Sequence, residues 1–302
     1  MILSIPSYFT IGDLRINFYG VTSALAYLLG VIVTCLLAKK RGFKSDDIIT
    51  LACFVIPLAI VGARIYFVLF NLDAYSNFVD VFKIWEGGLA FYGGVIGGGL
   101  GVLIYCLIFK KNFFALVDII VVAMALSQCL GRWGNFFNQE AYGTIVTDPA
   151  WQWFPFAVYI DRVSEWHLAT FFYESLWDLM NFAILLTLIS KVKFKQNFMV
   201  ASWYLVIYGI GRALIEGLRT DSLYIGHSSI RVSQLLSIIF VILGATFLIV
   251  NMIRNIKHKK NGTTPKPNLI DRDLSPVAEV EEKKEEIAQS NTTNQPDSKD
   301  KS

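Results

Sequence analysis

The chain has 302 residues, of which 54% are apolar, 14% aromatic and only 17% charged, and its mean hydropathy is +0.50. Soluble globular domains carry about 25% charged residues, so this composition excludes an ordinary soluble protein and indicates an integral membrane protein. The formal net charge of +3 indicates no particular partner, and because no nucleic-acid-binding motif is present we expect no nucleic-acid partner.

Seven apolar segments follow one another along the chain. Each is about 20 residues long, which is enough for a helix to cross a hydrocarbon core of roughly 30 Å. They cover residues 17–38, 48–70, 88–109, 116–138, 172–190, 198–218 and 232–252. The first lacks a small-residue cleavage site after a short apolar core, so we interpret it as a retained helix. The sequence therefore predicts an all-α polytopic membrane protein whose seven-helix domain covers residues 1–254.

Basic residues in the connecting segments predict the orientation. They concentrate after the first, third, fifth and seventh segments, and short cytoplasmic loops are enriched in lysine and arginine. They are Lys39, Lys40, Arg41, Lys44, Lys110, Lys111, Lys191, Lys193, Lys195, Arg254, Lys257, Lys259 and Lys260. An odd number of spans with this bias places the N-terminus outside and the C-terminus in the cytoplasm.

The composition changes at the end of the last apolar segment. Residues 255–302 are rich in Lys, Glu, Asp, Asn, Thr and Pro, and a segment of this composition buries too little apolar surface to fold. We therefore expect a disordered cytoplasmic tail.

Residues 139–171, between the fourth and fifth segments, form an outer loop or head segment that is rich in aromatic residues. Trp151, Trp153, Phe154 and Trp166 belong to it. Such residues are typical of an interfacial aromatic belt. The segment is also long enough to serve as a lid over a site, and the sequence leaves both interpretations open.

Three arginines within the apolar segments, Arg64, Arg132 and Arg212, are all expected toward the outer leaflet. Intramembrane charges are rare and usually functional. Asn135 lies three residues after Arg132 and Glu216 four residues after Arg212, so each pair shares a helix face. We expect Glu216 to neutralise one arginine and leave a net positive site. The alternatives are an Arg212–Glu216 pair that only fixes helix packing, and a snorkelling or packing role for Arg64.

The third segment begins with the glycine-rich run EGGLAFYGGVIGGGLG, residues 86–101. Small residues allow close approach of helices in lipid, and this explains most of these glycines. Gly93 and Gly94, beside Tyr92, also leave a bare backbone that a lipid head group or an extended peptide can approach.

No metal site and no cofactor are expected. The four cysteines lie within apolar segments without metal-ligand spacing, and the three histidines lie outside them. We interpret the cysteines as packing residues.

Several motifs in chain order resemble those of the bacterial prolipoprotein diacylglyceryl transferases. The resemblance covers almost the whole chain except the tail. The motifs are FYG at Phe18–Gly20, GGLAFYGG at Gly87–Gly94, GRWGNFFNQEAYG at Gly131–Gly143, FYESLW at Phe172–Trp177 and YGIGRALIEGLRTD at Tyr208–Asp221.

This resemblance implies a multi-pass enzyme of the bacterial cytoplasmic membrane with its active site toward the outer leaflet. The implied reaction transfers the diacylglyceryl group of phosphatidylglycerol to the thiol of a lipobox cysteine in the signal peptide of a prolipoprotein. A thioether forms and glycerol phosphate is released, as the first step of lipoprotein maturation. The implied partners are therefore phosphatidylglycerol, the prolipoprotein and membrane lipid.

The resemblance also implies roles for individual residues. It implies central active-site roles for Arg132, Asn135 and Glu140, essential partner roles for Arg212 and Glu216, and a supporting hydroxyl at Tyr19. Many members of the family carry histidine where this chain has Tyr92, so we expect Tyr92 to donate a hydrogen bond, because a phenol is a poor base near neutral pH.

The chemistry of the substrates agrees with these roles. The lipid phosphate gains negative charge as it leaves, so arginines that bind it more tightly in the transition state lower the barrier. We expect Arg132 and Arg212 to bind it, with Arg64, Tyr19, Gly93 and Gly94 as further lipid contacts. The thiol has an ordinary pKa of about 8.5, which a positive field lowers, and Glu140 is a candidate acceptor for its proton.

A membrane transporter for an anionic substrate is the alternative of another class. It predicts polar residues at the midplane of the membrane and internal repeats, and the sequence shows neither. A scaffold without catalytic activity leaves the three arginines without a role, and an intramembrane protease needs a serine–histidine pair or paired aspartates within the spans.

Overall fold

The computed structural model describes residues 6–72, 75, 77–84, 87–191, 197–222, 224 and 230–261. Seven of its helices are long and apolar enough to cross a membrane, which confirms the predicted number. They are α1 (Phe18–Ala38), α2 (Ser45–Leu69), α3 (Phe91–Phe109), α4 (Phe113–Asn138), α5 (Thr170–Lys191), α6 (Met199–Glu216) and α7 (Val232–Lys260).

The chain forms two compact units. The first comprises Met1–Ile48 and Ala115–Lys266, and therefore contains α1, nearly all of α4, and α5, α6 and α7. The second comprises Ile49–Phe114 and Pro267–Ser302, and its described part holds most of α2, the 3-10 helix η3 (Phe78–Phe82) and α3.

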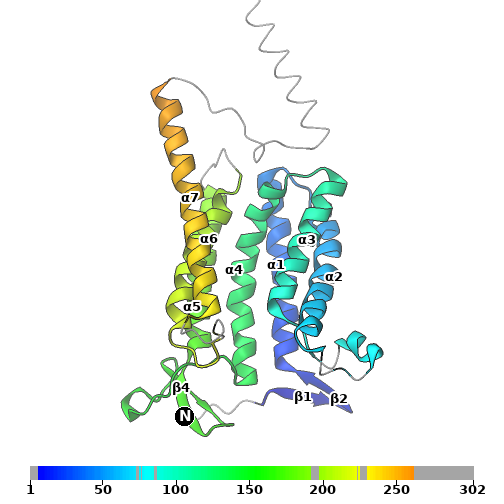
Figure 1. The fold of residues 1–302 in the computed structure, drawn as a ribbon, viewed down its shortest axis with the longest axis vertical. Helices are drawn as coiled ribbons and strands as arrows, with labels where there is room; N and C mark the ends of the chain where they lie inside the picture. Colours follow the sequence, from blue (N-terminus) through cyan, green and yellow to red (C-terminus); the bar gives the residue numbers. More distant parts are fainter. Residues whose placement is uncertain are drawn as a thin grey trace, which may run out of the picture. The chain divides into compact units, whose positions relative to one another are not determined.

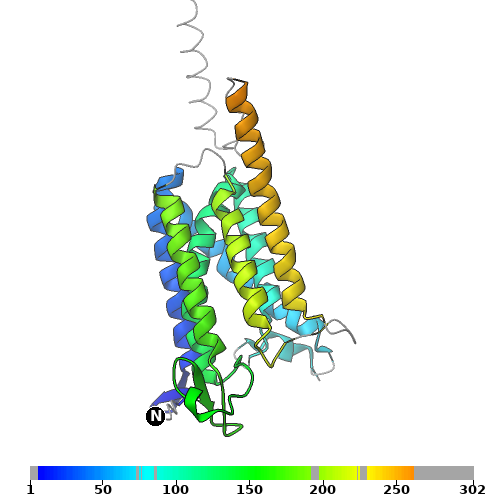
Figure 2. The ribbon, with the colours of Figure 1, turned by 90° about the vertical axis from the view of Figure 1, so that its left-hand side faces the viewer.

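The last helix is longer than the sequence predicts. Residues up to Lys260 are helical, whereas we expected the span to end at 252 and a tail to begin at 255. Arg254, Lys257 and Lys260 are good helix formers, so the helix continues beyond the apolar segment. In Figures 1 and 2, α7 extends past its neighbour α6 at this end. Residues 262–302 of the predicted tail lie outside the described residues.

Two short β-hairpins, both in the first unit, depart from the all-α prediction. Strands β1 (Tyr8–Ile11) and β2 (Leu14–Asn17) pair antiparallel directly before α1, and β3 (Ala157–Ile160) and β4 (Glu165–Leu168) pair antiparallel in the segment between α4 and α5. Each strand has four residues, too few for a clear alternation of apolar and polar positions. Two further 3-10 helices, η1 (Lys39–Arg41) and η5 (Pro149–Trp151), complete the described elements.

The head segment, residues 139–171, packs on the ends of two membrane helices. Val158, Ile160, Ala169 and Phe171 form a buried apolar cluster, against which Trp133 and other partly buried rings pack. The head segment is therefore folded on α4 and α5, and its role as a belt or a lid stays a prediction.

Close packing of glycines joins the two long helices of the second unit. A Cβ atom added at Gly97 would overlap the carbonyl oxygen of Leu58, and one added at Gly93 would overlap that of Gly62. The structure thus supports the packing explanation for these two glycines of the run. Gly94 is different, because its nearest neighbours would lie 3.7 Å from a Cβ.

A buried aspartate joins three segments where α1 ends and α6 begins. Asp118 of α4 has no exposed side-chain surface and pairs with Arg41 at 3.1 Å, between Oδ2 and Nη2. Its Oδ1 accepts a hydrogen bond of 2.8 Å from the backbone N–H of Ala201, in the first turn of α6.

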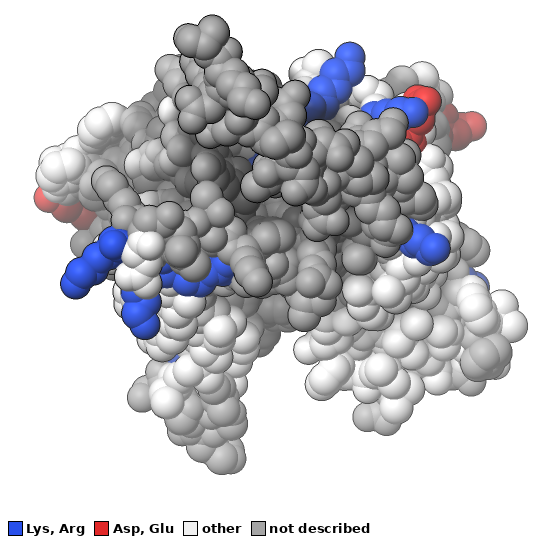
Figure 3. Space-filling view, turned by 90° about the horizontal axis from the view of Figure 1, so that it is seen from above, with Lys and Arg blue, Asp and Glu red and all other residues white. Residues whose placement is uncertain are grey.

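The described surface seen from above carries mostly lysine and arginine among its charged groups (Figure 3).

We expect the substitution Asp118→Ala to destabilise the protein by about 3–5 kcal/mol, because it leaves the Arg41 charge and a helix N-terminus without their buried partner. Thermal unfolding in detergent measures the effect. Asp13→Ala, in the exposed turn of the first hairpin, is the control and should change stability by less than about 0.5 kcal/mol. Equal melting temperatures for the two variants would contradict the assigned role of Asp118.

Candidate functional site

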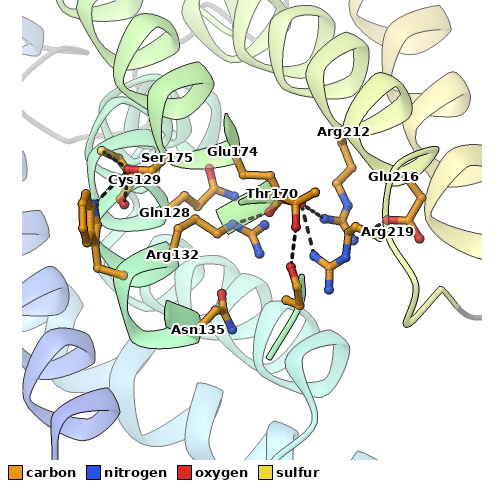
Figure 4. A network of polar contacts seen from close by, with 12 residues as sticks. Gln128, Cys129, Arg132, Asn135, Thr170, Glu174, Ser175, Arg212, Glu216 and Arg219 are labelled. Carbon is orange, nitrogen blue, oxygen red and sulfur yellow. Dashed lines mark hydrogen bonds and ion pairs between the residues drawn. The ribbon is translucent and has the colours of Figure 1, made fainter. Parts of the chain in front are cut away.

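Four membrane helices of the first unit meet at the end that carries the hairpins. Helices α1 and α5 begin there, and α4 and α6 end there (Figure 1). Polar residues of α4, α5, α6 and the loop after α6 lie close together there, and the arginines among them converge on Glu174 (Figure 4).

Glu174, in the second turn of α5, is the centre of this network. Its side chain is 5% exposed, and its Oε2 lies 2.6 Å from Nε of Arg132. Its Oε1 lies 2.7 Å from Nη1 of Arg212 and 3.1 Å from Nη1 of Arg219. One buried carboxylate therefore holds arginines from α4, from α6 and from the loop after α6.

Two further carboxylates complete the ion pairs. Glu216 contacts Arg212 at 2.7 Å, one helical turn away, as its spacing predicts. Asp221 binds Arg219 through two parallel hydrogen bonds of 2.9 and 2.7 Å. The three arginines thus face three carboxylates, so these six charges sum to zero, and the prediction of a net positive site is wrong. Helical spacing could not reveal Glu174, because it lies on a different helix.

Arg219 and Asp221, which lie outside the membrane-spanning helices, shift each other's pKa. Burial alone would raise the pKa of Asp221, but the hydrogen bonds and positive charge of Arg219 outweigh it and lower that pKa. Burial alone would lower the pKa of Arg219, and its bonds to Asp221 and Glu174 raise it instead. Both groups are therefore charged at neutral pH.

Arg132 differs from the other two arginines in how it is held. Only its Nε contacts Glu174, and the side chain is 21% exposed. Among the described residues, Nη1 and Nη2 of Arg132 have no hydrogen-bond or ion-pair partner. The planar guanidinium is thus fixed along one edge and offers two parallel donors at the other, a geometry that suits a phosphate group.

Asn135 and Glu140 meet where α4 ends. The Asn135 side-chain amide donates a 2.9 Å hydrogen bond to Oε1 of Glu140, and the Glu140 backbone N–H donates to the Asn135 carbonyl at 3.1 Å. The turn that follows α4 has positive φ at Gln139 (50°) and at Ala141 (57°). These two backbone conformations bring the chain back toward the helix. The structure therefore brings these two predicted residues together, one turn beyond Arg132.

Tyr19 lies beside the same turn of α4. Its ring covers Gly134, where an added Cβ would lie 2.8 Å from Cδ2 of the ring, and 41% of the residue is exposed. The predicted supporting hydroxyl thus lies in the first unit, where Tyr19 interacts electrostatically with Glu140 and Arg132.

Tyr92, Gly93, Gly94 and Arg64 belong to the second unit. Arg64 is 8% exposed, and its guanidinium donates to the backbone carbonyls of Val81 (2.6 Å), Asp80 (2.8 Å), Gly87 (2.7 Å) and Gly88 (3.0 Å). This supports the packing alternative for Arg64, because the side chain organises the loop before α3.

The sequence interpretation assigned no role to Glu174, although the residue lies in the quoted FYESLW motif. A glutamate within a predicted membrane segment is itself a signal of function or of a buried ion pair. Asp178, one turn further along α5, carries the same signal and is 3% exposed.

Comparison with known proteins agrees with this architecture. The sequence model of the family described as prolipoprotein diacylglyceryl transferase matches residues 6–250. Phosphatidylglycerol–prolipoprotein diacylglyceryl transferase 1 of Clostridium perfringens is 40% identical over 84% of this chain and 97% of its own. Proteins with the same enzyme name, without the number, are 43% identical in Finegoldia magna (83% and 95% covered) and 39% identical in Streptococcus equi subsp. equi (80% and 93% covered).

The seven long apolar helices and the enzyme names of these relatives identify a polytopic membrane enzyme. The chain belongs to the prolipoprotein diacylglyceryl transferase family.

We expect Glu174→Gln to lower the free energy of unfolding by about 3–5 kcal/mol, because the amide leaves the Arg132 charge without its buried partner. Glu216→Gln should lower the free energy of unfolding less, because Glu216 pairs only with Arg212. In that variant Arg212 still contacts Glu174. Thermal unfolding in detergent ranks the two, and Glu165→Gln, half exposed on β4, is the control. An equal or larger loss for Glu216→Gln would contradict the central position of Glu174.

Proposed function

We propose that the chain transfers the diacylglyceryl group of phosphatidylglycerol to the thiol of a lipobox cysteine in a prolipoprotein signal peptide. The thiol sulfur forms a bond to the glyceryl carbon, and the bond from that carbon to the phosphate oxygen breaks. The products are a thioether, glycerol phosphate and one proton. Family membership supports the reaction, and the observation that carries the site is the anchored Arg132, whose two Nη donors have no partner in the described part of the chain.

Arg132 is the phosphate-binding residue of this proposal. Its Nε is occupied by Glu174, so Nη1 and Nη2 bind two phosphate oxygens without competing with the ion pair. The phosphate changes from one negative charge to two as it leaves, so these hydrogen bonds strengthen along the reaction and stabilise the transition state. Arg212 supports the same anion, at the far side of Glu174.

Asn135, Glu140 and Tyr19 surround the reacting end of the lipid in this proposal. The amide of Asn135 fixes the Glu140 carboxylate, and the exposed Tyr19 hydroxyl donates a hydrogen bond to lipid. Within the second unit, described by itself, Tyr92 is proposed to donate a hydrogen bond to lipid and Gly94 to admit lipid beside its backbone, whereas Gly93 and Arg64, first expected as lipid contacts, have packing contacts with Gly62 and with the loop before α3.

The site faces the outer leaflet of the bacterial cytoplasmic membrane in this proposal. Arg132 lies at the end of α4 and Arg212 at the end of α6, whereas the basic residues of the positive-inside pattern follow α1, α3, α5 and most of α7. The lipobox cysteine of a secreted precursor reaches the membrane surface on that outer side.

We expect Arg132→Ala to reduce transfer at least about 100-fold, because one transition-state donor site contributes about that much. Arg132→Lys should restore little of the activity, since an ammonium cannot both pair with Glu174 and bind phosphate bidentately. The assay mixes purified protein with labelled phosphatidylglycerol and a lipobox peptide, with a cysteine-to-serine peptide as the blank and Arg162→Ala, exposed in the head segment, as the control. Full activity of Arg132→Lys would contradict bidentate binding.

We expect Tyr92→Phe to lower the rate of the same reaction by up to about tenfold, which is the size of one neutral hydrogen bond. Tyr27→Phe, in an exposed part of α1, is the control and should keep its activity. A Tyr92→Phe variant with full activity would remove the Tyr92 hydroxyl from the chemistry.

A further inference from the structure

Two buried polar residues continue the polar face of α5 beneath Glu174. Asp178 is 3% exposed and Asn181 is fully buried. Asp178 Oδ2 and both side-chain amide atoms of Asn181 have no hydrogen-bond partner among the described residues. Such groups are costly within a membrane segment and mark functional positions there.

Asp178 lies in the wall of a cavity that it shares with the arginine network. Arg132, Glu174, Tyr208 and Arg212 also line this cavity, whose volume of about 10 Å³ suits about one water molecule. The titratable and charged groups that interact electrostatically with Asp178 come from all three helices around it. They are Cys129 and Arg132 of α4, Glu174 of α5, and Tyr204, Tyr208 and Arg212 of α6.

Five carboxylates of the first unit lie in or beside the arginine network, and they fall into two groups. Glu174, Glu216 and Asp221 are each held by an arginine. Asp178 and Glu140 form no ion pair with a described residue, and Glu140 is hydrogen-bonded by Asn135 and exposed. A carboxylate bound by arginine loses that pair when it takes up a proton, so a proton acceptor is expected in the second group.

We propose that Asp178 accepts the proton that the lipobox thiol loses, through a water molecule in this cavity. The inference rests on the proposed transfer reaction. The S–H bond breaks, the sulfur takes the glyceryl carbon, and the carbon–oxygen bond to phosphate breaks. The proton moves to the Asp178 carboxylate and then leaves with the glycerol phosphate or to solvent.

The reason for preferring Asp178 to Glu140 is charge balance. Before reaction, ionised Asp178 and the phosphodiester carry two negative charges and the thiol none. Afterwards, protonated Asp178 is neutral, the phosphate monoester carries two charges and the thioether none. The total charge of the buried site is unchanged, whereas a proton moved to exposed Glu140 would leave one more negative charge in the buried site, where charge is costly.

Asp178→Asn tests this assignment, because it preserves the shape and removes the ability to accept the proton. We expect kcat to fall about 100-fold or more, the usual contribution of a general base, with KM for phosphatidylglycerol changed less than about threefold. Asp178→Glu should recover part of kcat. Asn181→Leu, on the same buried face, and Glu140→Gln are tested in parallel, and the melting temperature in detergent reports whether each variant is folded.

A lipobox peptide with selenocysteine in place of its cysteine separates proton acceptance from folding. A selenol is largely ionised at neutral pH, so it needs no acceptor, and the ratio of wild-type to Asp178→Asn activity should fall toward one with this peptide. A ratio that stays as large as with the cysteine peptide would overturn the proposal, as would an Asp178→Asn variant that keeps kcat while Glu140→Gln loses it. Absence of transfer by the wild-type protein would instead contradict the proposed reaction itself.

Discussion

The buried carboxylate of Glu174 is the interaction on which the rest of the site depends. It contacts arginines from α4, from α6 and from the loop after α6, at distances between 2.6 and 3.1 Å. A cation placed at this depth without a partner is costly, so these segments are held together by the charges as well as by packing. Removing Glu174 would leave Arg132 without its ion pair, whereas Arg212 and Arg219 would keep Glu216 and Asp221.

In the proposed reaction, this arrangement lets a membrane site bind an anion without being strongly positive. The arginines are already matched by Glu174, Glu216 and Asp221, so the protein folds without a large unpaired charge in lipid. Among the described residues, Nη1 and Nη2 of Arg132 carry no such pair, and these are the donors that the proposed reaction uses. The remaining ion pairs fix its orientation, which is the pre-organisation that electrostatic catalysis requires, because no group has to reorient when charge develops.

The sequence was sufficient for the features that depend on local periodicity. Seven apolar segments gave seven helices, and spacing along one helix gave the Arg212–Glu216 contact. It was insufficient where partners come from different helices, as for Arg132 and Glu174, because no local pattern reports which helices are neighbours. The hairpins were missed for a related reason, since strands of four residues have too short a pattern to distinguish them from loops.

The head segment is mechanically connected to the arginine network. The Thr144 backbone N–H donates to the Leu218 carbonyl at 3.0 Å, and the backbone and hydroxyl of Thr220 both donate to the Tyr142 carbonyl. Arg219 lies between these two residues and contacts Glu174, so a displacement of residues 142–144 is transmitted to the centre of the site. Residues 166–168 are hydrogen-bonded to residues 143–146 and belong to the same frame. If the head segment acts as a lid, the moving part must therefore lie between residues 147 and 165, while residues 142–146 and 166–168 stay with the frame that holds Glu174 and, through it, Arg132.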